Sequence, residues 1–305
     1  MEAVKYFADE RTCFDFVASL RWLDGHPVCP HCGNNTVYFL STRKIFKCKA
    51  KECRKQFSIK TGTIFEDSAI KLDKWLIAMW KLANAKNGIS SYELHRALGI
   101  TQKSAWFVLH RIRTAMQTGS IEKLSGEVES DETYIGPNAK NMHWDKRKDL
   151  QVMSGYPDHK TAVMGMVQRG GKIKATVLKR RNLATMSKIL AENIEQGSTV
   201  ITDEAKQYVH LRENYIHEVI NHSREYVKGN IHTNNIENFW SLLKRTIKGT
   251  YVSVSPAHLQ KYVEEQVFRY NERKGTDQQR FVSMIDLISG KRLTYSQLIG
   301  YETSH

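Results

Sequence analysis

The sequence predicts a multidomain protein that combines α+β and α/β parts, and three observations lead to that prediction. The chain has 305 residues, which is enough for two or more domains. Two closely spaced pairs of cysteines stand near the N-terminus, ahead of several amphipathic helical patterns. After residue 125, short strand-like runs alternate with helical patterns. We therefore expect a small cysteine-rich module, a helical module and a larger domain of strands and helices.

The composition narrows the class of function. Lys and Arg total 46 against 32 Asp and Glu, a formal charge of +14, which is a common footprint of nucleic-acid binding. Simple solubility would also explain a net charge, although an excess of acid serves solubility better. No run of 18 apolar residues occurs, which argues against a membrane span, and the acidic N-terminus lacks the apolar core of a signal peptide. We expect an intracellular protein whose five cysteines form no disulfides.

Four of the cysteines predict a zinc ribbon. Their spacing is C-x2-C-x15-C-x4-C, and the zinc ligands would be Cys29, Cys32, Cys48 and Cys53. Residues 36–40 and 44–47, between the pairs, have the pattern of short strands. The fifth cysteine, Cys13, lies on the apolar face of a predicted helix over residues 3–23, so we assign it to the core. A redox pair or free thiols are the alternative, and a closed four-thiolate zinc site would be structural.

Residues 66–120 predict a helix-turn-helix that binds DNA. A short helix capped by Ser90 stops at Gly99, and Thr101 caps the next helix. Side chains in this second helix suit base edges near its start and phosphates further along. The predicted DNA-binding residues are Gln102, Lys103, Ser104, His110, Arg111 and Arg113. An ordinary helical hairpin with a solvated basic face is the alternative.

Two later strands bring acids to unusual places. Residues 126–136 form a strand-like run with several carboxylates and no clean apolar face. Such clustering needs a counter-ion or a functional reason, and an exposed edge strand is the structural alternative. A predicted hairpin and a helix follow over residues 161–179 and 184–195. The apolar run 198–203 then ends in Asp203. An acid at the C-terminal end of a buried strand is a usual place for chemistry in α/β folds.

The segment 232–248 predicts an amphipathic helix with two different faces. Its apolar face would be formed by Ile236, Phe239, Trp240, Leu243 and Ile247. Glu237 and Lys244 share a second face, two turns apart, where they could hold a metal ion and a phosphate. Asn234 and Glu237 also have the spacing of a capping box, which would be a purely structural role.

The order of these segments resembles a known family. The stretches that carry the resemblance are RWLDGHPVCPHCG, SDETYIG, ITDEAKQY, HTNNIENFWSLLKR and EEQVFRYNER. Together they resemble the bacterial insertion-sequence transposases of the DDE type, which join an N-terminal zinc ribbon to a catalytic domain with a ribonuclease-H-like fold. The resemblance covers roughly residues 1–275 and implies a mixed sheet flanked by helices.

The resemblance also implies a catalytic site. The implied catalytic residues are Asp131, Asp203, Glu237 and Lys244. The three acids would hold Mg²⁺ or Mn²⁺, as two ions at one site, while the thiolates keep Zn²⁺. Some similar proteins carry Asn or His at the third acidic position, so Asn238 is an alternative to Glu237. Glu132 and Glu204 are alternatives to the aspartates beside them.

The implied function is a transposase that binds the ends of a mobile DNA element and catalyses strand cleavage and strand transfer. A DNA-binding regulator with an inactive catalytic domain and a metal-dependent DNA nuclease are the alternatives. The expected partner is double-stranded DNA, and no membrane partner is expected. The protein would form a homodimer or a higher oligomer. It would be found in the bacterial cytoplasm, associated with the nucleoid. The expected parts are the ribbon at 1–60, the helix-turn-helix at 66–120, the catalytic domain at 125–274 and a C-terminal tail at 275–305.

Overall fold

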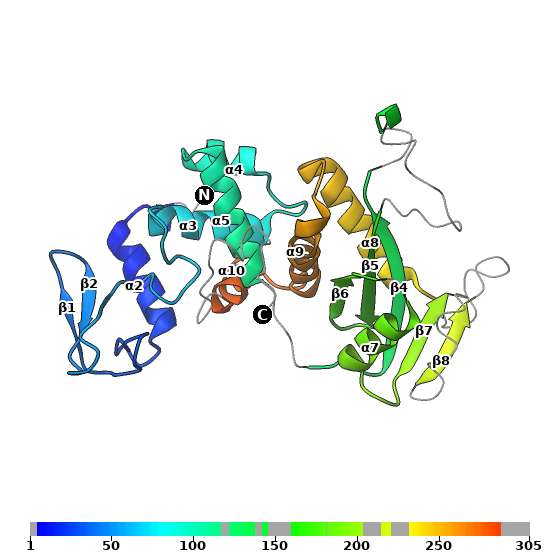
Figure 1. The fold of residues 1–305 in the computed structure, drawn as a ribbon, viewed down its shortest axis with the longest axis horizontal. Helices are drawn as coiled ribbons and strands as arrows, with labels where there is room; N and C mark the ends of the chain where they lie inside the picture. The colour runs from blue at the N-terminus through cyan, green and yellow to red at the C-terminus, as the bar shows by residue number, and fades with distance from the viewer. Residues whose placement is uncertain are drawn as a thin grey trace. The chain divides into compact units, whose positions relative to one another are not determined.

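The computed structural model of the chain describes residues 5–116, 122–137, 142–145, 160–180, 182–203, 215–220 and 232–287. The chain divides into two compact units, one formed by residues 1–118 and 275–305 and the other by residues 119–274. The first unit contains a three-stranded sheet and the second a five-stranded sheet (Figure 1).

The N-terminal unit opens with helix α2 (Glu10–Arg21) and a small antiparallel sheet. Its strands, in sheet order, are β1 (Val37–Leu40), β2 (Ile45–Cys48) and β3 (Gln56–Phe57). The two strands predicted between the cysteine pairs are therefore confirmed. Phe46, in the central strand, packs against Trp22 and Phe57 with ring centroids 5.2 and 5.3 Å away. These aromatic contacts give the small sheet an apolar core in addition to its cysteines.

Three helices follow in the same unit. They are α3 (Leu72–Asn84), α4 (Ser91–Leu98) and α5 (Gln102–Ala115). The Ser90 hydroxyl accepts a hydrogen bond from the backbone N–H of Glu93 at 3.1 Å, and Thr101 caps α5 in the same way. Gly99 ends α4 with a φ of +60°, a left-handed conformation that favours glycine. The capping residues read from the sequence thus begin and end these helices.

Helix α10 (Asp277–Asp286) packs against α3 inside the N-terminal unit. The ring centroids of Phe281 and Trp80 lie 5.4 Å apart. Nearby, Arg280 Nε donates to Asn84 Oδ1 at 3.0 Å. The sequence predicted one short helix in a C-terminal tail. The helix is present, and its buried aromatic face makes it part of the N-terminal unit.

The second unit is built on a mixed sheet in the order β6-β5-β4-β7-β8. The strands are β4 (Glu127–Ile135), β5 (Thr161–Gln168), β6 (Ile173–Val177), β7 (Thr199–Asp203) and β8 (Ile216–Ile220). The first three pair antiparallel, whereas β7 runs parallel to β4 and β8 runs parallel to β7. The acid-bearing strand β4 is therefore central in the sheet and is not the exposed edge that the sequence left open.

Helices cover both faces of this sheet. One face of β4, represented by Val128, packs in a cluster with Met186 and Leu190 of α7 (Leu183–Asn193). The other face, represented by Ile135, packs in a cluster with α8 (Asn234–Thr246) and α9 (Leu259–Asn271). Alternate strand residues point to opposite faces, so successive residues of β4 point in turn to the α7 side and to the α8 side of the sheet. The mixed sheet flanked by helices is the architecture expected from the resemblance (Figure 1).

Strand β8 was not predicted. It is a five-residue edge strand with His217 and Glu218 in its middle, and such a run has little apolar pattern.

Among the residues that the structure describes, no helix is long and apolar enough to span a bilayer.

Candidate functional site

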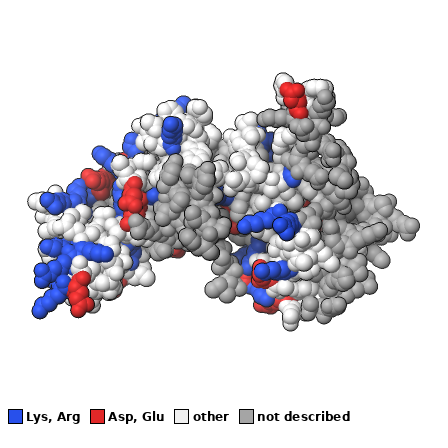
Figure 2. Space-filling view, in the orientation of Figure 1, with Lys and Arg blue, Asp and Glu red and all other residues white. Residues whose placement is uncertain are grey.

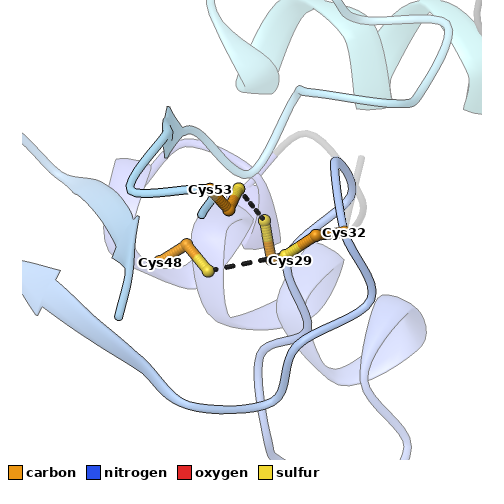
Figure 3. Close-up of side chains that lie close together, drawn as sticks. All are labelled: Cys29, Cys32, Cys48 and Cys53. Atoms are coloured by element: carbon orange, nitrogen blue, oxygen red, sulfur yellow. Dashed lines mark hydrogen bonds between the residues drawn. The ribbon is translucent and has the colours of Figure 1, made fainter. Parts of the chain in front are cut away.

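The four predicted zinc ligands converge at one point of the N-terminal unit (Figure 3). Their sulfur atoms all lie within 4.8 Å of one another, with Sγ–Sγ distances of 3.8 Å for one pair and 3.6 Å for another. A tetrahedral shell with Zn–S bonds of about 2.3 Å has sulfurs about 3.8 Å apart. The donors are Cys29, Cys32, Cys48 and Cys53. This set of four thiols fits Zn²⁺ in a closed, structural site.

Tight turns hold these cysteines in place. The backbone N–H of Gly33 donates to Cys29 O at 2.9 Å, and Gly33 has a φ of +73° that favours glycine.

Cys13 is separate from this cluster. Its thiol is buried and donates to Phe7 O at 3.3 Å, and burial raises the pKa of Cys13 to about 11. Cys13 is a core residue, as the sequence predicted.

Asp131 lies in the middle of β4, on the face that meets α8. The indole Nε1 of Trp240 donates to Asp131 Oδ2 at 3.0 Å. The register of β4 and β5 sets Gly165 opposite Asp131. A Cβ atom on Gly165 would lie 2.7 Å from the rings of Trp240 and from Ile236, so this position needs glycine for α8 to approach the sheet closely. Glu132, the alternative acid, lies at a neighbouring position whose side chain points to the opposite face of the sheet.

Asp203 is the last residue of β7, beside β4 in the sheet. The parallel register pairs Glu127 with Thr199 and Glu129 with Ile201, two pairs that each differ by 72 positions. Asp131 and Asp203 also differ by 72 positions, and each follows the last of these pairs by two residues along its own strand. The side chain of Asp203 and the alternative acid Glu204 lie outside the described part of the chain.

Helix α8 has the two faces predicted from its sequence. The residues of its apolar face are all buried, namely Ile236, Phe239, Trp240, Leu243 and Ile247. Glu237, Asn238 and Lys244 are exposed on its other side. The Thr233 hydroxyl donates to Glu237 Oε1 at 3.2 Å.

The capping box proposed for Asn234 and Glu237 is absent. The helix starts after Thr233, and Asn234 is already its first residue. The backbone N–H groups of the next two residues donate to Glu129 Oε2 of strand β4, at 2.9 and 3.1 Å. Glu129 of β4 thus accepts the hydrogen bonds that the side chain of a capping residue would otherwise accept at the start of α8. Sequence reasoning missed Glu129, and its only signal was a position two residues before Asp131 on the same strand face.

The predicted DNA-binding residues of α5 separate into two groups. Gln102, Lys103 and Ser104 stand in the first turn, and the ammonium-bearing Lys103 is exposed. They line a surface hollow of about 620 Å³ together with residues 67–70 and two aromatic side chains of α5. Gln102 Nε2 also donates to Ser91 Oγ at 2.9 Å, which connects α5 to α4.

The other three residues predicted to contact DNA are buried in this unit. The buried residues are His110, Arg111 and Arg113. Arg111 Nη1 donates to Ile64 O at 2.7 Å, and burial lowers the pKa of Arg111. His110 stacks on Trp106 with ring centroids 3.9 Å apart. A backbone carbonyl thus binds the Arg111 guanidinium, and the Trp106 ring packs on His110, so both side chains contribute to the packing of the helix.

A basic surface covers the small sheet of the N-terminal unit. Residues 43–55 contain one acid, Glu52, among several exposed cations. These exposed cations, which we call the ribbon basic surface, are Arg43, Lys44, Lys49, Lys51, Arg54 and Lys55. Figure 2 shows Lys and Arg side chains gathered over the β1–β2 end of this unit. No DNA contact was predicted for these residues from the sequence.

The comparisons with known proteins agree with the two units. A family model described as an ISXO2-like transposase domain matches residues 123–271, and one described as a transposase zinc-ribbon domain matches residues 8–56. The chain is also similar to an uncharacterized protein in transposable element ISH50 of Halobacterium salinarum. The two are 28% identical over 255 residues, which is 80% of this chain and 85% of that relative. The chain therefore combines a region that matches a transposase zinc-ribbon domain with one that matches an ISXO2-like transposase domain, and it is similar to a protein of an insertion-sequence element.

Proposed function

We propose that this protein binds the ends of its mobile element and catalyses metal-dependent cleavage and strand transfer of DNA. The observation that supports the proposal most is the parallel pairing of β4 with β7. Asp131 stands two residues beyond Glu129, and Asp203 stands two residues beyond Ile201, the partner of Glu129. Neighbouring strands are about 4.8 Å apart where they are paired. Two ionised carboxylates that come close together repel each other unless a cation neutralises them.

The residues at this site fit hard divalent cations. Carboxylate oxygens suit Mg²⁺ or Mn²⁺, and Asp131 is half-buried with one oxygen already oriented by the Trp240 indole. Asp131, Asp203 and Glu237 would hold the ions. When bound, two such ions supply an activated water or DNA 3′-hydroxyl and stabilise the leaving oxygen of the scissile phosphate.

The residues of α8 have separate tasks in this proposal. Glu237, exposed near the start of the helix, supplies the third carboxylate, with Asn238 as the alternative. Lys244, exposed two turns after Glu237, binds a DNA phosphate near the cut. Trp240, on the buried side, holds Asp131 in a fixed orientation.

Strand order supports a ribonuclease-H-like fold for the catalytic part. Three antiparallel strands are followed by two parallel ones, with the first strand in the centre and helices on both faces. We assign the catalytic domain to residues 125–274, the ribbon to 1–60 and the helix-turn-helix to 66–120. Helix α10 is then a part of the N-terminal unit and not of a separate tail.

DNA recognition belongs to the N-terminal unit in this proposal. Helices α4 and α5 form the helix-turn-helix, and Gln102, Lys103 and Ser104 contact base edges. The ribbon basic surface contacts phosphates. Because two element ends must be joined to one target, the working form is a dimer or a larger assembly on DNA.

The proposal is tested by a strand-transfer assay run beside a gel-shift assay on element-end DNA. Asp131→Asn and Asp203→Asn should each abolish cleavage and joining and leave DNA binding intact. Glu192→Gln, an exposed acid on α7, is the matched control and should stay active. Strand transfer at the wild-type rate by either aspartate variant would refute the site. Hydrolysis without joining by the wild type would favour a nuclease, and DNA binding alone would favour a regulator.

A further inference from the structure

Glu129 is a buried acid of β4 that the proposed metal site does not use. Its side chain is 0% exposed, and both of its oxygens accept hydrogen bonds. Oε2 accepts from the backbone N–H of Asn235 at 2.9 Å and of Ile236 at 3.1 Å. Oε1 accepts from Asn235 Nδ2 at 2.7 Å and from Arg169 Nε at 3.1 Å. A carboxylate this deep is tolerated because donors and a cation compensate its charge.

The two backbone donors belong to the second and third residues of α8. N–H groups at the start of a helix have no acceptor within the helix and usually bond to the side chain just before it. Here Glu129, 106 positions earlier than Asn235, accepts instead. The positive end of the helix dipole adds to the attraction. The start of α8 is thus bonded to a strand that is distant in sequence.

Arg169 connects a third segment to the same carboxylate. It stands in the turn between β5 and β6, and its Nη1 donates to Glu127 Oε2 at 2.6 Å. Its Nη2 donates to His232 O, just before α8, at 3.0 Å. The guanidinium therefore ties β4, the β5–β6 turn and the approach to α8 together. We call the contacts of Glu129 with Arg169 and the first turn of α8 the helix latch.

A second contact between β4 and α8 matches the spacing of the first. Trp240, one turn after Ile236, donates to Asp131, two residues after Glu129. Two strand residues span about 6.6 Å and four helix residues about 6 Å, so both contacts form without distortion. Sliding of α8 along β4 would break both. Glu237 lies on α8 between the two fixed points.

We propose that Glu129 is a positioning residue: it fixes α8 on β4 and thereby fixes where Glu237 stands relative to Asp131. Glu129 does not itself hold metal, because both of its oxygens are taken up by α8 and Arg169. The positioning role rests on the proposed function, since it concerns the metal site. The helix latch is independent of the proposed function, since it consists of hydrogen bonds within the folded chain.

The test uses the full-length, zinc-loaded protein and two readouts besides activity. In Glu129→Gln the amide NH2 group faces donors whichever way it is turned: either the two backbone N–H groups of α8, or Asn235 Nδ2 and Arg169 Nε. The charge and part of the hydrogen bonds are therefore lost in both orientations, which weakens the hold on the first turn of α8. We expect hydrogen exchange of the Asn235 and Ile236 amides to accelerate at least about tenfold. We expect the affinity for Mn²⁺, measured by titration, to fall about tenfold. Glu127→Gln is the matched control, because it also removes a carboxylate from Arg169 but touches no residue of α8, and both readouts should stay near wild type.

Each outcome decides a part of the proposal. Unchanged exchange in Glu129→Gln would overturn the helix latch, and faster exchange with unchanged Mn²⁺ affinity would overturn the positioning role. A wild type that binds no Mn²⁺ would overturn the proposed function and the positioning role, while the exchange result would still decide the latch. Asn235→Ala, which removes only the 2.7 Å side-chain bond, serves if Glu129→Gln does not fold. It should change both readouts in the same direction by a smaller factor, and no change would overturn the proposal.

Discussion

The carboxylate of Asp131 has two neighbours that come from different elements of the second unit. Trp240 donates to it from α8 at 3.0 Å. Gly165 on β5 leaves the space that the indole occupies, because a Cβ there would lie 2.7 Å from the ring. The hydrogen bond can therefore be removed while the ring that fills this space is kept.

Trp240→Phe should lower the rate of strand transfer about tenfold. The variant keeps an aromatic ring over Gly165 but loses a hydrogen bond to a charged group, which contributes about 1.5–3 kcal/mol in proteins. A rate assay at several Mg²⁺ concentrations measures the change, with more Mg²⁺ needed for half-maximal rate. Trp80→Phe, the same change in the N-terminal unit, should have no effect on the rate. An unaltered rate and Mg²⁺ dependence in Trp240→Phe would contradict the orienting role.

Glu237→Gln should nearly abolish strand transfer and leave the melting temperature unchanged within a few degrees. The side chain is exposed and is not part of a capping box, so its charge contributes little to the fold. A metal ligand, in contrast, loses a hard, charged oxygen in this substitution. Asn238→Ala is the comparison, since its position is the alternative third ligand. Full activity in Glu237→Gln with none in Asn238→Ala would show that the neighbour holds the metal.

Single residues were predictable where a periodic pattern decides their place. The apolar face of α8 and the core position of Cys13 followed from helical spacing alone. The burial of Arg111 did not, because its acceptor Ile64 O comes from a segment 47 positions away. Glu129 was not predicted for the same reason, since its partners lie 40 to 107 positions downstream. A sequence pattern reports the local period and not the contacts between distant segments.

The prediction that the N-terminal unit holds one zinc ion can be tested by metal analysis. Purified protein should contain one zinc ion per chain, and Cys29→Ser with Cys48→Ser should lose it, because two of four thiolates are removed. Metal analysis measures the content. Cys13→Ala is the matched control and should keep its zinc, since Cys13 lies in the core. Full zinc retention in the double variant, or only a trace in the wild type, would rule out this site.

The elements predicted well are those with strong boundary signals. Ser90, Gly99 and Thr101 delimit α4 and α5 as the sequence indicated. Strand β8 lacked such signals and was missed. For α8 the type of element was right. The cap considered at Asn234 was an alternative, and sequence alone cannot show that a carboxylate of β4 bonds to the start of this helix. The residue types at its ends show where a helix begins and stops. They do not show which distant group accepts hydrogen bonds from its first turn.

Taken over the full chain, the charge of +14 is unevenly placed. The ribbon basic surface combines six exposed cations with one acid, Glu52. Replacing Lys49, Lys51 and Lys55 by Gln should weaken binding to any DNA sequence. It should also reduce the slope of log affinity against log salt by up to about 3, because each phosphate contact contributes about 0.9 to that slope. Fluorescence anisotropy from low to moderate salt measures it, and Lys188→Gln on α7 should leave the slope unchanged. An unaltered slope in the triple variant would remove this surface from the DNA interface.

The claim that Asp131 and Asp203 jointly hold divalent metal is tested most directly by Mn²⁺ titration of the full-length protein on element-end DNA, followed by electron paramagnetic resonance. The wild type should bind two Mn²⁺ ions per active site. Asp131→Asn and Asp203→Asn should each lose at least one of them and still bind DNA, whereas Glu192→Gln should bind both. The same Mn²⁺ stoichiometry and affinity in the wild type and in both aspartate variants would contradict the account.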